Sequence, residues 1–272
     1  ETYGSCPFQF FVGYVLKLEM KEPPEIGLNA RQIGSILHRV LEQVYKEAGR
    51  NPNLPYLLEI FEGVTDYIFR NAPREIGFRP SALWSVEQSQ LTQMLRENIQ
   101  TLESQRGGWI PYAFEKKFGL ERTPPLILNL KKDSILLRGL IDRVDINTQG
   151  ELRIIDYKKS GTKLASRDFI EGQRLQLPIY ALAAQNALGL GEVVEGFYWI
   201  IQDVKASSLK LSNLQTEENT GLENAEKILL EHLENYLTNI RIGQFLPTPP
   251  KGGCPSYCPA VQWCWRYQAS NY

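Results

Sequence analysis

The sequence predicts an α/β protein in which helices flank a central mixed β-sheet, with a helical insertion and a cysteine staple that joins the chain ends. Three observations predict this class. Residues 109–158 contain short runs of alternating apolar and polar residues, which is the periodicity of strands. Apolar residues before and after that region recur at three- and four-residue steps, as they do in helices. One cysteine lies near the start of the chain and three lie near its end.

Length and composition indicate one well-packed domain. The 272 residues, 43% of them hydrophobic, are enough to bury a full core. The 30 basic and 31 acidic residues nearly cancel, so a surface that binds nucleic acid would have to be a local patch. No apolar run is long enough to span a membrane, and we expect no membrane partner and a cytoplasmic location. The chain starts at Glu1 without a signal-peptide pattern, and we expect it to be a domain of a longer protein.

We treat residues 1–272 as a single domain with four parts: a helix that carries a histidine, a helical insertion, a core, and a C-terminal helix with the cysteine cluster. Their predicted ranges are 28–50, 51–108, 109–212 and 213–272. A further helix is predicted after Cys6, before the proline pair at 23–24. Its apolar residues recur at helical steps, which predicts packing against the core: Phe8, Phe11, Tyr14 and Val15.

The helix within residues 28–50 is predicted to begin after Asn29, an N-cap residue, and to end near residue 48. One stripe of this helix carries Gly34, His38, Leu41 and Tyr45. Gly34 would allow a strand to approach closely. A single histidine on such a face is more often a core residue than a metal ligand, so the pattern alone favours a core role for His38.

Residues 51–108 predict two or more helices separated by prolines. A helical stripe in the second half indicates a layer that covers the sheet: Leu91, Met94, Leu95 and Ile99. Strands are predicted from Trp109 onward. In the first strand, Glu115 shares a face with Ala113 and Lys117. The pattern alone therefore does not require Glu115 to be buried and favours a solvated charge.

Residues 136–158 predict a β-hairpin whose turn is Asn147 to Gly150. Side chains alternate along strands, so Asp142 shares a face with aliphatic neighbours in the first strand, and Asp156 and Lys158 do so in the second. Unpaired buried charges are costly. The group is therefore either a salt-bridged sheet surface or a site where both carboxylates hold a divalent cation.

After Asp168 the sequence predicts one helix with Gln173, Gln176 and Tyr180 on one face. These side chains could bond phosphate oxygens or cap neighbouring loops. Residues 193–204 and 206–212 predict an outer strand pair, and residues 217–243 a long amphipathic helix.

The cysteines form a one-plus-three pattern: Cys6, then Cys254, Cys258 and Cys264 in a C-x3-C-x5-C arrangement. Disulfides are one interpretation, but three thiols within eleven residues favour a shared metal centre. Zinc accepts four thiolates, although its usual paired C-x2-C spacing is absent.

Five motifs follow one another along the chain: Gly34 with His38, Glu115, Gly139 to Arg143, Asp156 to Lys158, and Gln176 with Tyr180. Together they resemble the RecB-like branch of the PD-(D/E)XK nuclease superfamily. The resemblance implies a restriction-endonuclease-like core and a Mg2+ or Mn2+ ion held by His38, Asp142, Asp156 and the backbone carbonyl of Tyr157. It implies catalytic roles for Asp142, Asp156, Lys158 and Glu115, and DNA contacts by Gln173, Gln176 and Tyr180.

The cysteine pattern resembles the iron-sulfur staple of AddB-type nuclease domains, although the first gap of the C-terminal trio is one residue longer here. The resemblance implies a [4Fe-4S] cluster on Cys6, Cys254, Cys258 and Cys264, with zinc as the alternative.

The implied function is metal-dependent hydrolysis of DNA, as an exonuclease on single-stranded or unwound ends in recombinational repair. DNA is the implied substrate, and a helicase subunit or domain outside this chain is the implied partner. Two alternatives stay open. A CRISPR adaptation nuclease is the nearest related enzyme, but such enzymes are usually more compact, so residues 51–108 count against it. A non-catalytic DNA-end-binding module stabilised by an iron-sulfur cluster belongs to a different class.

Overall fold

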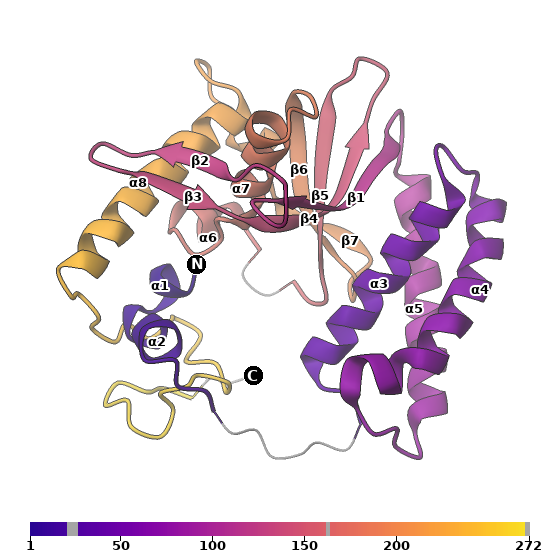
Figure 1. Ribbon diagram of the computed structural model, residues 1–272, viewed down its shortest axis with the longest axis horizontal. Coiled ribbons are helices and arrows are strands. Elements are labelled where there is room, and N and C mark those ends of the chain that lie inside the picture. The colour runs from indigo at the N-terminus through magenta and orange to yellow at the C-terminus, as the bar shows by residue number, and fades with distance from the viewer. Residues whose placement is uncertain (21–26, 162–163, 270–272) are drawn as a thin grey trace.

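A five-stranded mixed sheet forms the centre of the protein, in a computed structural model that describes residues 1–20, 27–161 and 164–269 (Figure 1). The strand order is β1-β4-β5-β6-β7, in which β5 and β6 are parallel and the other neighbours are antiparallel. The strands are β1 (Ile110–Phe118), β4 (Gly139–Ile146), β5 (Leu152–Lys158), β6 (Val193–Ile200) and β7 (Lys205–Lys210). The predicted α/β class and the β4–β5 hairpin are confirmed. A second hairpin, β2 (Leu126–Asn129) with β3 (Ser134–Leu137), extends from the sheet.

Helices cover both faces of this sheet (Figure 1). On one face, α3 (Ala30–Ala48), α4 (Leu54–Ala72) and α5 (Trp84–Ser104) pack on Ile155, Tyr157 and other residues of β5 and β6. On the other face, α7 (Gln176–Leu182) and α8 (Gly221–Arg241) pack on Val144 and Ile154. No helix in the described ranges is long and apolar enough to cross a membrane.

Helix α3 begins as the sequence predicts. The Asn29 side chain accepts a hydrogen bond from the Gln32 N–H, and the Gln32 side chain accepts one from the Asn29 N–H, which together form a capping box. The prediction for Gly34 is wrong. A Cβ at Gly34 would meet no described atom within 4 Å, so no strand approaches the helix there.

The helical insertion is fixed to the end of β6 by one buried amide. The stripe predicted on α5 is confirmed, since Leu91, Leu95 and Ile99 are buried and Met94 packs on the same core. Beside it, the Asn98 side chain accepts from the Trp199 indole N–H at 2.6 Å and donates to the Ile201 carbonyl at 2.9 Å. These bonds satisfy polar groups that would otherwise be buried without partners.

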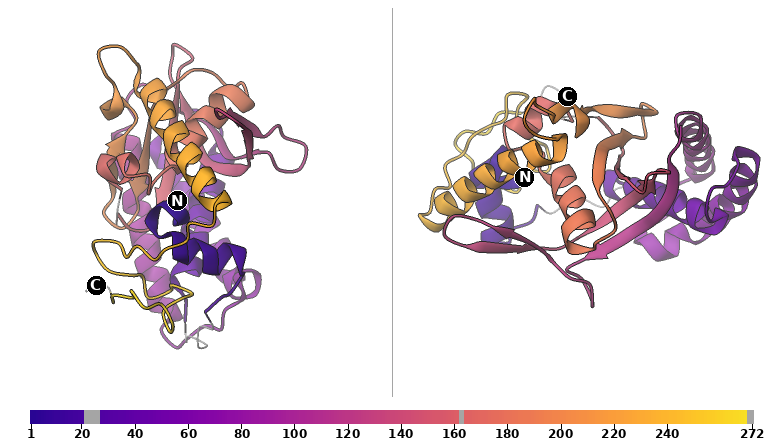
Figure 2. Two further views of the ribbon diagram at one scale, coloured as in Figure 1. Left: turned by 90° about the vertical axis from the view of Figure 1, so that its left-hand side faces the viewer. Right: turned by 90° about the horizontal axis from the view of Figure 1, so that it is seen from above.

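The two ends of the chain meet in a small lobe beside the sheet (Figure 2). Here α1 (Thr2–Ser5), α2 (Pro7–Phe10) and a π-helical turn (Phe11–Val15) lie against the C-terminal coil, and the Phe8 ring contacts Trp263 and Trp265. The predicted burial of Tyr14 and Val15 is wrong, because they are 64% and 48% exposed. This segment packs on the C-terminal coil through Val12, so only part of its apolar stripe is covered.

Two further predictions differ from the structure. The helix predicted after Asp168 is two helices, α6 (Ser166–Ile170) and α7, separated by a turn that contains Gln173. Gly172 makes this turn with a φ of +78°, and a Cβ there would collide with the Tyr236 hydroxyl. The predicted outer strand pair is β6 and β7, but only β7 is at the edge, because β6 also pairs with β5.

The amide of Asn98 generates the first testable prediction. Asn98→Leu should lower the free energy of unfolding by about 1–3 kcal/mol or more, because it leaves the Trp199 N–H and the Ile201 carbonyl buried without their side-chain partner. Denaturant unfolding measures the change. Gln100→Leu, at an exposed position of the same helix, should change stability by less than about 0.5 kcal/mol. Equal stability of Asn98→Leu and wild type would contradict the assignment.

Candidate functional site

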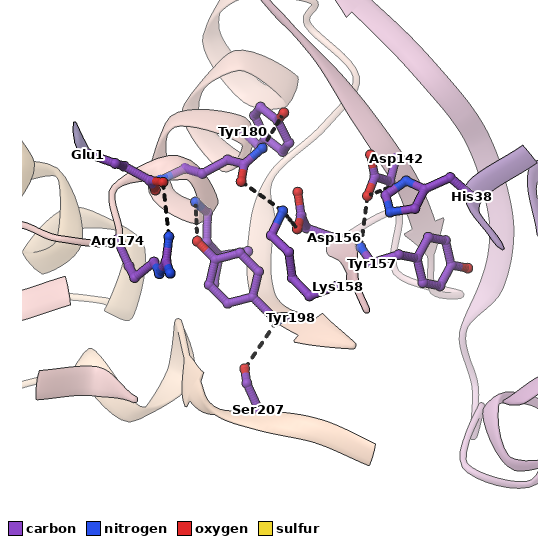
Figure 3. Close-up of polar contacts among 12 residues, drawn as sticks. Glu1, His38, Asp142, Asp156, Tyr157, Lys158, Arg174, Tyr180, Tyr198 and Ser207 are labelled. Carbon is purple, nitrogen blue, oxygen red and sulfur yellow. Dashed lines mark hydrogen bonds and ion pairs between the residues drawn. The ribbon is translucent and has the colours of Figure 1, made fainter. Parts of the chain in front are cut away.

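The candidate site lies where β4 and β5 separate. The two strands pair from Ile146 and Leu152 as far as Arg143 and Ile155. Beyond that pair, the Asp142 carboxylate takes the position of a backbone acceptor, since its Oδ2 accepts a hydrogen bond from the Tyr157 N–H at 2.8 Å (Figure 3). The separation gives Asp142 and Asp156 room at the end of the sheet, between α3 and α7.

Three side chains from three elements form a group that could hold a cation. His38 of α3, Glu115 of β1 and Asp142 of β4 each offer one ligand atom, and these atoms all lie within 4.8 Å of one another. The His38 Nδ1 lies 3.4 Å from the Asp142 Oδ2, and its ring packs edge-on against Tyr157. Burial lowers the pKa of His38, which favours the neutral imidazole that ligates metals.

Asp156 lies beside this group and is fully buried. Its Oδ1 has no hydrogen-bond partner among the described residues, and its Oδ2 forms an ion pair with Lys158. Burial, together with the nearby Asp142, raises the pKa of Asp156 to about 7, although Lys158 acts in the opposite direction. Burial also raises the pKa of Asp142 to about 6, and burial with Asp142 raises that of Glu115 to about 7. A buried carboxylate with one oxygen left unpaired among the described residues, next to a neutral imidazole and two more carboxylates, fits a divalent cation.

Glu115 reaches the site because its strand is irregular. The register of β1 against β4 shifts between Pro111 and Ala113, and Glu115 has a φ of +45°, which is unusual for a residue with a side chain. The alternation that predicts a solvated Glu115 assumes a regular strand. The structure instead groups Glu115 with His38 and Asp142, half-buried.

The residues predicted to contact DNA lie in two places. The Lys158 ammonium donates to the Gln176 Oε1 at 2.9 Å, and the Gln176 Nε2 donates to the Tyr180 hydroxyl at 2.6 Å. Gln176 and Tyr180 therefore hold Lys158 in this structure. Gln173 lies apart from them in its turn, where its side chain contacts Glu171 at 3.4 Å.

Comparison with known proteins decides the family. A family model described as the PD-(D/E)XK nuclease superfamily matches residues 1–265. The chain belongs to the PD-(D/E)XK nuclease superfamily. The resemblance given by the five motifs is thus confirmed.

Curated relatives of this PD-(D/E)XK chain are each named as a subunit of an ATP-dependent helicase/deoxyribonuclease. The protein of Carboxydothermus hydrogenoformans is 30% identical over 262 residues, which are 87% of this chain and 24% of that protein. The protein of Moorella thermoacetica is 32% identical over 211 residues, which are 72% of this chain and 18% of that protein. The chain spans less than a quarter of the length of either relative.

A buried ion network behind the site carries residues to which the sequence assigns no role. The Arg143 side chain is fully buried, donates to Asp145 at 2.6 Å and to the Tyr157 hydroxyl at 3.3 Å, and stacks on the Tyr45 ring. It therefore ties α3 to β4 and β5 of the PD-(D/E)XK core. The sequence feature that could have indicated this network is the pair Arg143 and Asp145, two residues apart on the strand face opposite Asp142.

The four cysteines lie in the lobe where the chain ends meet. Cys6, Cys254 and Cys258 are buried, Cys264 is partly exposed, and none forms a disulfide. Burial raises the pKa of the Cys258 thiol, and the other three cysteines act in the same direction. Thiolates are ligands of zinc and of iron-sulfur clusters, but the compact group of possible metal ligands among the described residues contains none of these four cysteines.

The raised carboxyl pKa values predict how stability depends on pH. Asp and Glu in the unfolded chain have pKa values of about 4, so without metal the folded chain binds more protons than the unfolded chain between about pH 4 and 7. Its stability therefore falls as pH rises through this window. Asp156→Asn removes one buried charge, and its melting temperature at pH 8 with chelator should exceed that of wild type by several degrees.

Differential scanning calorimetry between pH 5 and 8 measures this difference, which should shrink toward pH 5. Asp66→Asn removes an exposed carboxylate of α4 and should leave the melting temperature nearly unchanged. A variant Asp156→Asn that is no more stable than wild type at pH 8 would refute the prediction.

Proposed function

We propose that this chain is a Mg2+- or Mn2+-dependent deoxyribonuclease, which acts as an exonuclease on single-stranded or unwound DNA ends in recombinational repair. One observation carries the proposal: His38, Glu115 and Asp142 meet beside a buried Asp156 whose Oδ1 has no hydrogen-bond partner in the part of the chain that the structure describes. Membership of a nuclease superfamily and relatives named as deoxyribonuclease subunits support it.

The ligands proposed for the cation are His38, Asp142, Asp156 and the Tyr157 carbonyl, with Glu115 added because it groups with His38 and Asp142. A bound Mg2+ or Mn2+ supplies a Lewis acid for the scissile phosphate and lowers the pKa of a water molecule. The protein prepares this site by burying its carboxylates, so that they gain more from a cation than solvated carboxylates would.

Lys158 supplies the positive charge on the substrate side. Its ammonium lies between the Asp156 carboxylate and the Gln176 amide oxygen, with the Tyr198 ring 5.4 Å away. We assign it electrostatic stabilisation of the negative charge that gathers on the phosphate oxygens. Gln176 and Tyr180 keep it in place, and Gln173, near the surface, is proposed to contact the DNA backbone.

For the four cysteines we propose a structural [4Fe-4S] cluster, with zinc as the alternative. Cys6 precedes the sheet and the other three follow it, so a shared centre would tie both ends of the chain to one point. A helicase subunit or domain outside this chain is the proposed partner, because the relatives are named as helicase/deoxyribonuclease subunits.

The nuclease proposal is tested by cleavage of end-labelled linear DNA, single-stranded and duplex, with Mg2+, Mn2+ or chelator. Wild type should cleave only with metal, and the product ladder should show the direction of digestion. Asp156→Ala and Lys158→Ala should each slow cleavage at least about a hundredfold, because they remove charge that acts on the transition state. Asp66→Asn should cleave like wild type.

Cleavage at the wild-type rate by either variant, or cleavage in chelator, would contradict this mechanism. DNA binding without any cleavage by the full chain would favour the non-catalytic DNA-end-binding module.

The cluster proposal predicts the spectrum of anaerobically purified protein. The sample should absorb broadly in the visible region and contain equal amounts of iron and acid-labile sulfide. Cys6→Ser should lower the absorbance and the melting temperature, because the chain ends lose a common anchor, whereas the neighbouring Ser5→Ala should change neither. A colourless protein with stoichiometric zinc would replace the cluster by the zinc alternative.

A further inference from the structure

The first residue of the chain contacts a helix that lies more than 170 positions later. The Glu1 Oε1 accepts hydrogen bonds from the N–H groups of Leu175 and Gln176, both at 2.9 Å. Its Oε2 lies 3.5 Å from the Arg174 guanidinium, and Figure 3 shows the two side chains facing each other. The Glu1 carboxylate is therefore bound at the start of α7.

This contact supplies what the helix itself lacks. The first N–H groups of a helix have no partner within it, and α7 has no side-chain cap of its own, because Leu175 occupies the N-cap position. Glu1 accepts from two of these groups, and the Tyr198 hydroxyl accepts from the next, the Leu177 N–H at 3.2 Å. A carboxylate is also the charge that a helix N-terminus favours.

The turn that Glu1 holds carries the residue that binds Lys158. Gln176 is the first residue of α7, its Oε1 accepts from the Lys158 ammonium, and its Nε2 donates to Tyr180 one turn later. Because the amide is fixed on both sides, its position follows the backbone of this first turn. A shift of that turn would move the amide oxygen away from Lys158 and leave the ammonium paired with Asp156 alone.

We propose that Glu1 is a positioning residue for Lys158: its carboxylate fixes the first turn of α7, so that Gln176 holds the Lys158 ammonium at the site. This inference rests on the proposed nuclease function, which it deepens. Glu1 and Cys6 flank the single-turn helix α1, and the Cys6 sulfur accepts from the Thr248 N–H at 3.5 Å. Contacts that hold Cys6 therefore also hold Glu1 in place.

Steady-state cleavage by the full chain with Mn2+ tests the proposal. Glu1→Ala should lower kcat about ten- to a hundredfold, because a misplaced group costs rate even when it is still present. The KM for DNA and the Mn2+ affinity, measured by calorimetry, should stay within about twofold, since Glu1 touches neither the metal ligands nor the proposed DNA contact. Glu1→Gln should recover most of kcat, because its amide oxygen can still accept the two N–H bonds.

A matched control separates positioning from general loss of stability. Asp168 also caps a helix with a carboxylate, since it lies in the first turn of α6 and its Oδ2 accepts from the Ala165 N–H at 2.9 Å. This side-chain hydrogen bond does not involve Gln176 or Lys158. Asp168→Ala should lower the melting temperature about as much as Glu1→Ala while kcat stays at the wild-type value. Equal kcat in Glu1→Ala and wild type, or equal losses of kcat in Glu1→Ala and Asp168→Ala, would overturn the proposal.

A double-mutant cycle and a labelling experiment complete the test. If Glu1 acts through Gln176, the variant Glu1→Ala/Gln176→Ala should be no slower than Gln176→Ala, whereas additive losses would overturn the proposal. Acylation of Lys158, followed by mass spectrometry relative to exposed Lys132, should be several-fold faster in Glu1→Ala than in wild type. Unchanged labelling of Lys158 would overturn the inference whether or not wild type cleaves DNA. Absence of DNA cleavage by wild type would contradict only the proposed function.

Discussion

The site depends on one hydrogen bond, from the Tyr157 N–H to the Asp142 carboxylate. It replaces a backbone bond at the point where β4 and β5 separate, and so it holds the gap open without leaving the N–H unpaired. The gap exposes the end of the sheet to helices from both layers. From one side α3 brings His38, and from the other α7 brings Gln176. The other side chains of the site either lie in this gap or hold a residue that lies there.

Two groups of charged side chains lie on opposite sides of β4 and β5, and they differ in how well they are paired. Arg143 and Asp145 are both fully buried and satisfy each other, with Tyr45 and Tyr157 as further partners. Burial raises the pKa values of Asp142, Asp156 and Glu115, and the Asp142 charge acts in the same direction on the other two. Lys158 acts against these shifts at Asp142 and Asp156, and Lys46 does so at Glu115. The first arrangement fixes the position of α3. The second costs stability in the metal-free chain, as a site built to bind a cation does.

Local sequence patterns predicted the elements of this protein well. Asn29 marks the start of α3, Asn147 to Gly150 mark the hairpin turn, and the apolar stripe of α5 is buried, because capping, turn formation and periodicity are properties of neighbouring residues. The same patterns failed where a distant segment decides the outcome. Tyr14 is exposed because only part of its stripe is covered by the C-terminal coil, and Gln173 leaves the helix because Gly172 turns against Tyr236.

By itself, the sequence determined the family of the chain, the order of its elements and the residue types at its site, since five motifs can be recognised without their geometry. Only the tertiary structure decided how those residues are combined. It moved Glu115 into the group of His38 and Asp142 through an irregular strand, turned Gln176 toward Lys158, and placed Glu1 on α7. The physical reason is that contacts between residues far apart in the chain depend on bulges, strand separation and helix ends, which leave no periodic signal in the sequence.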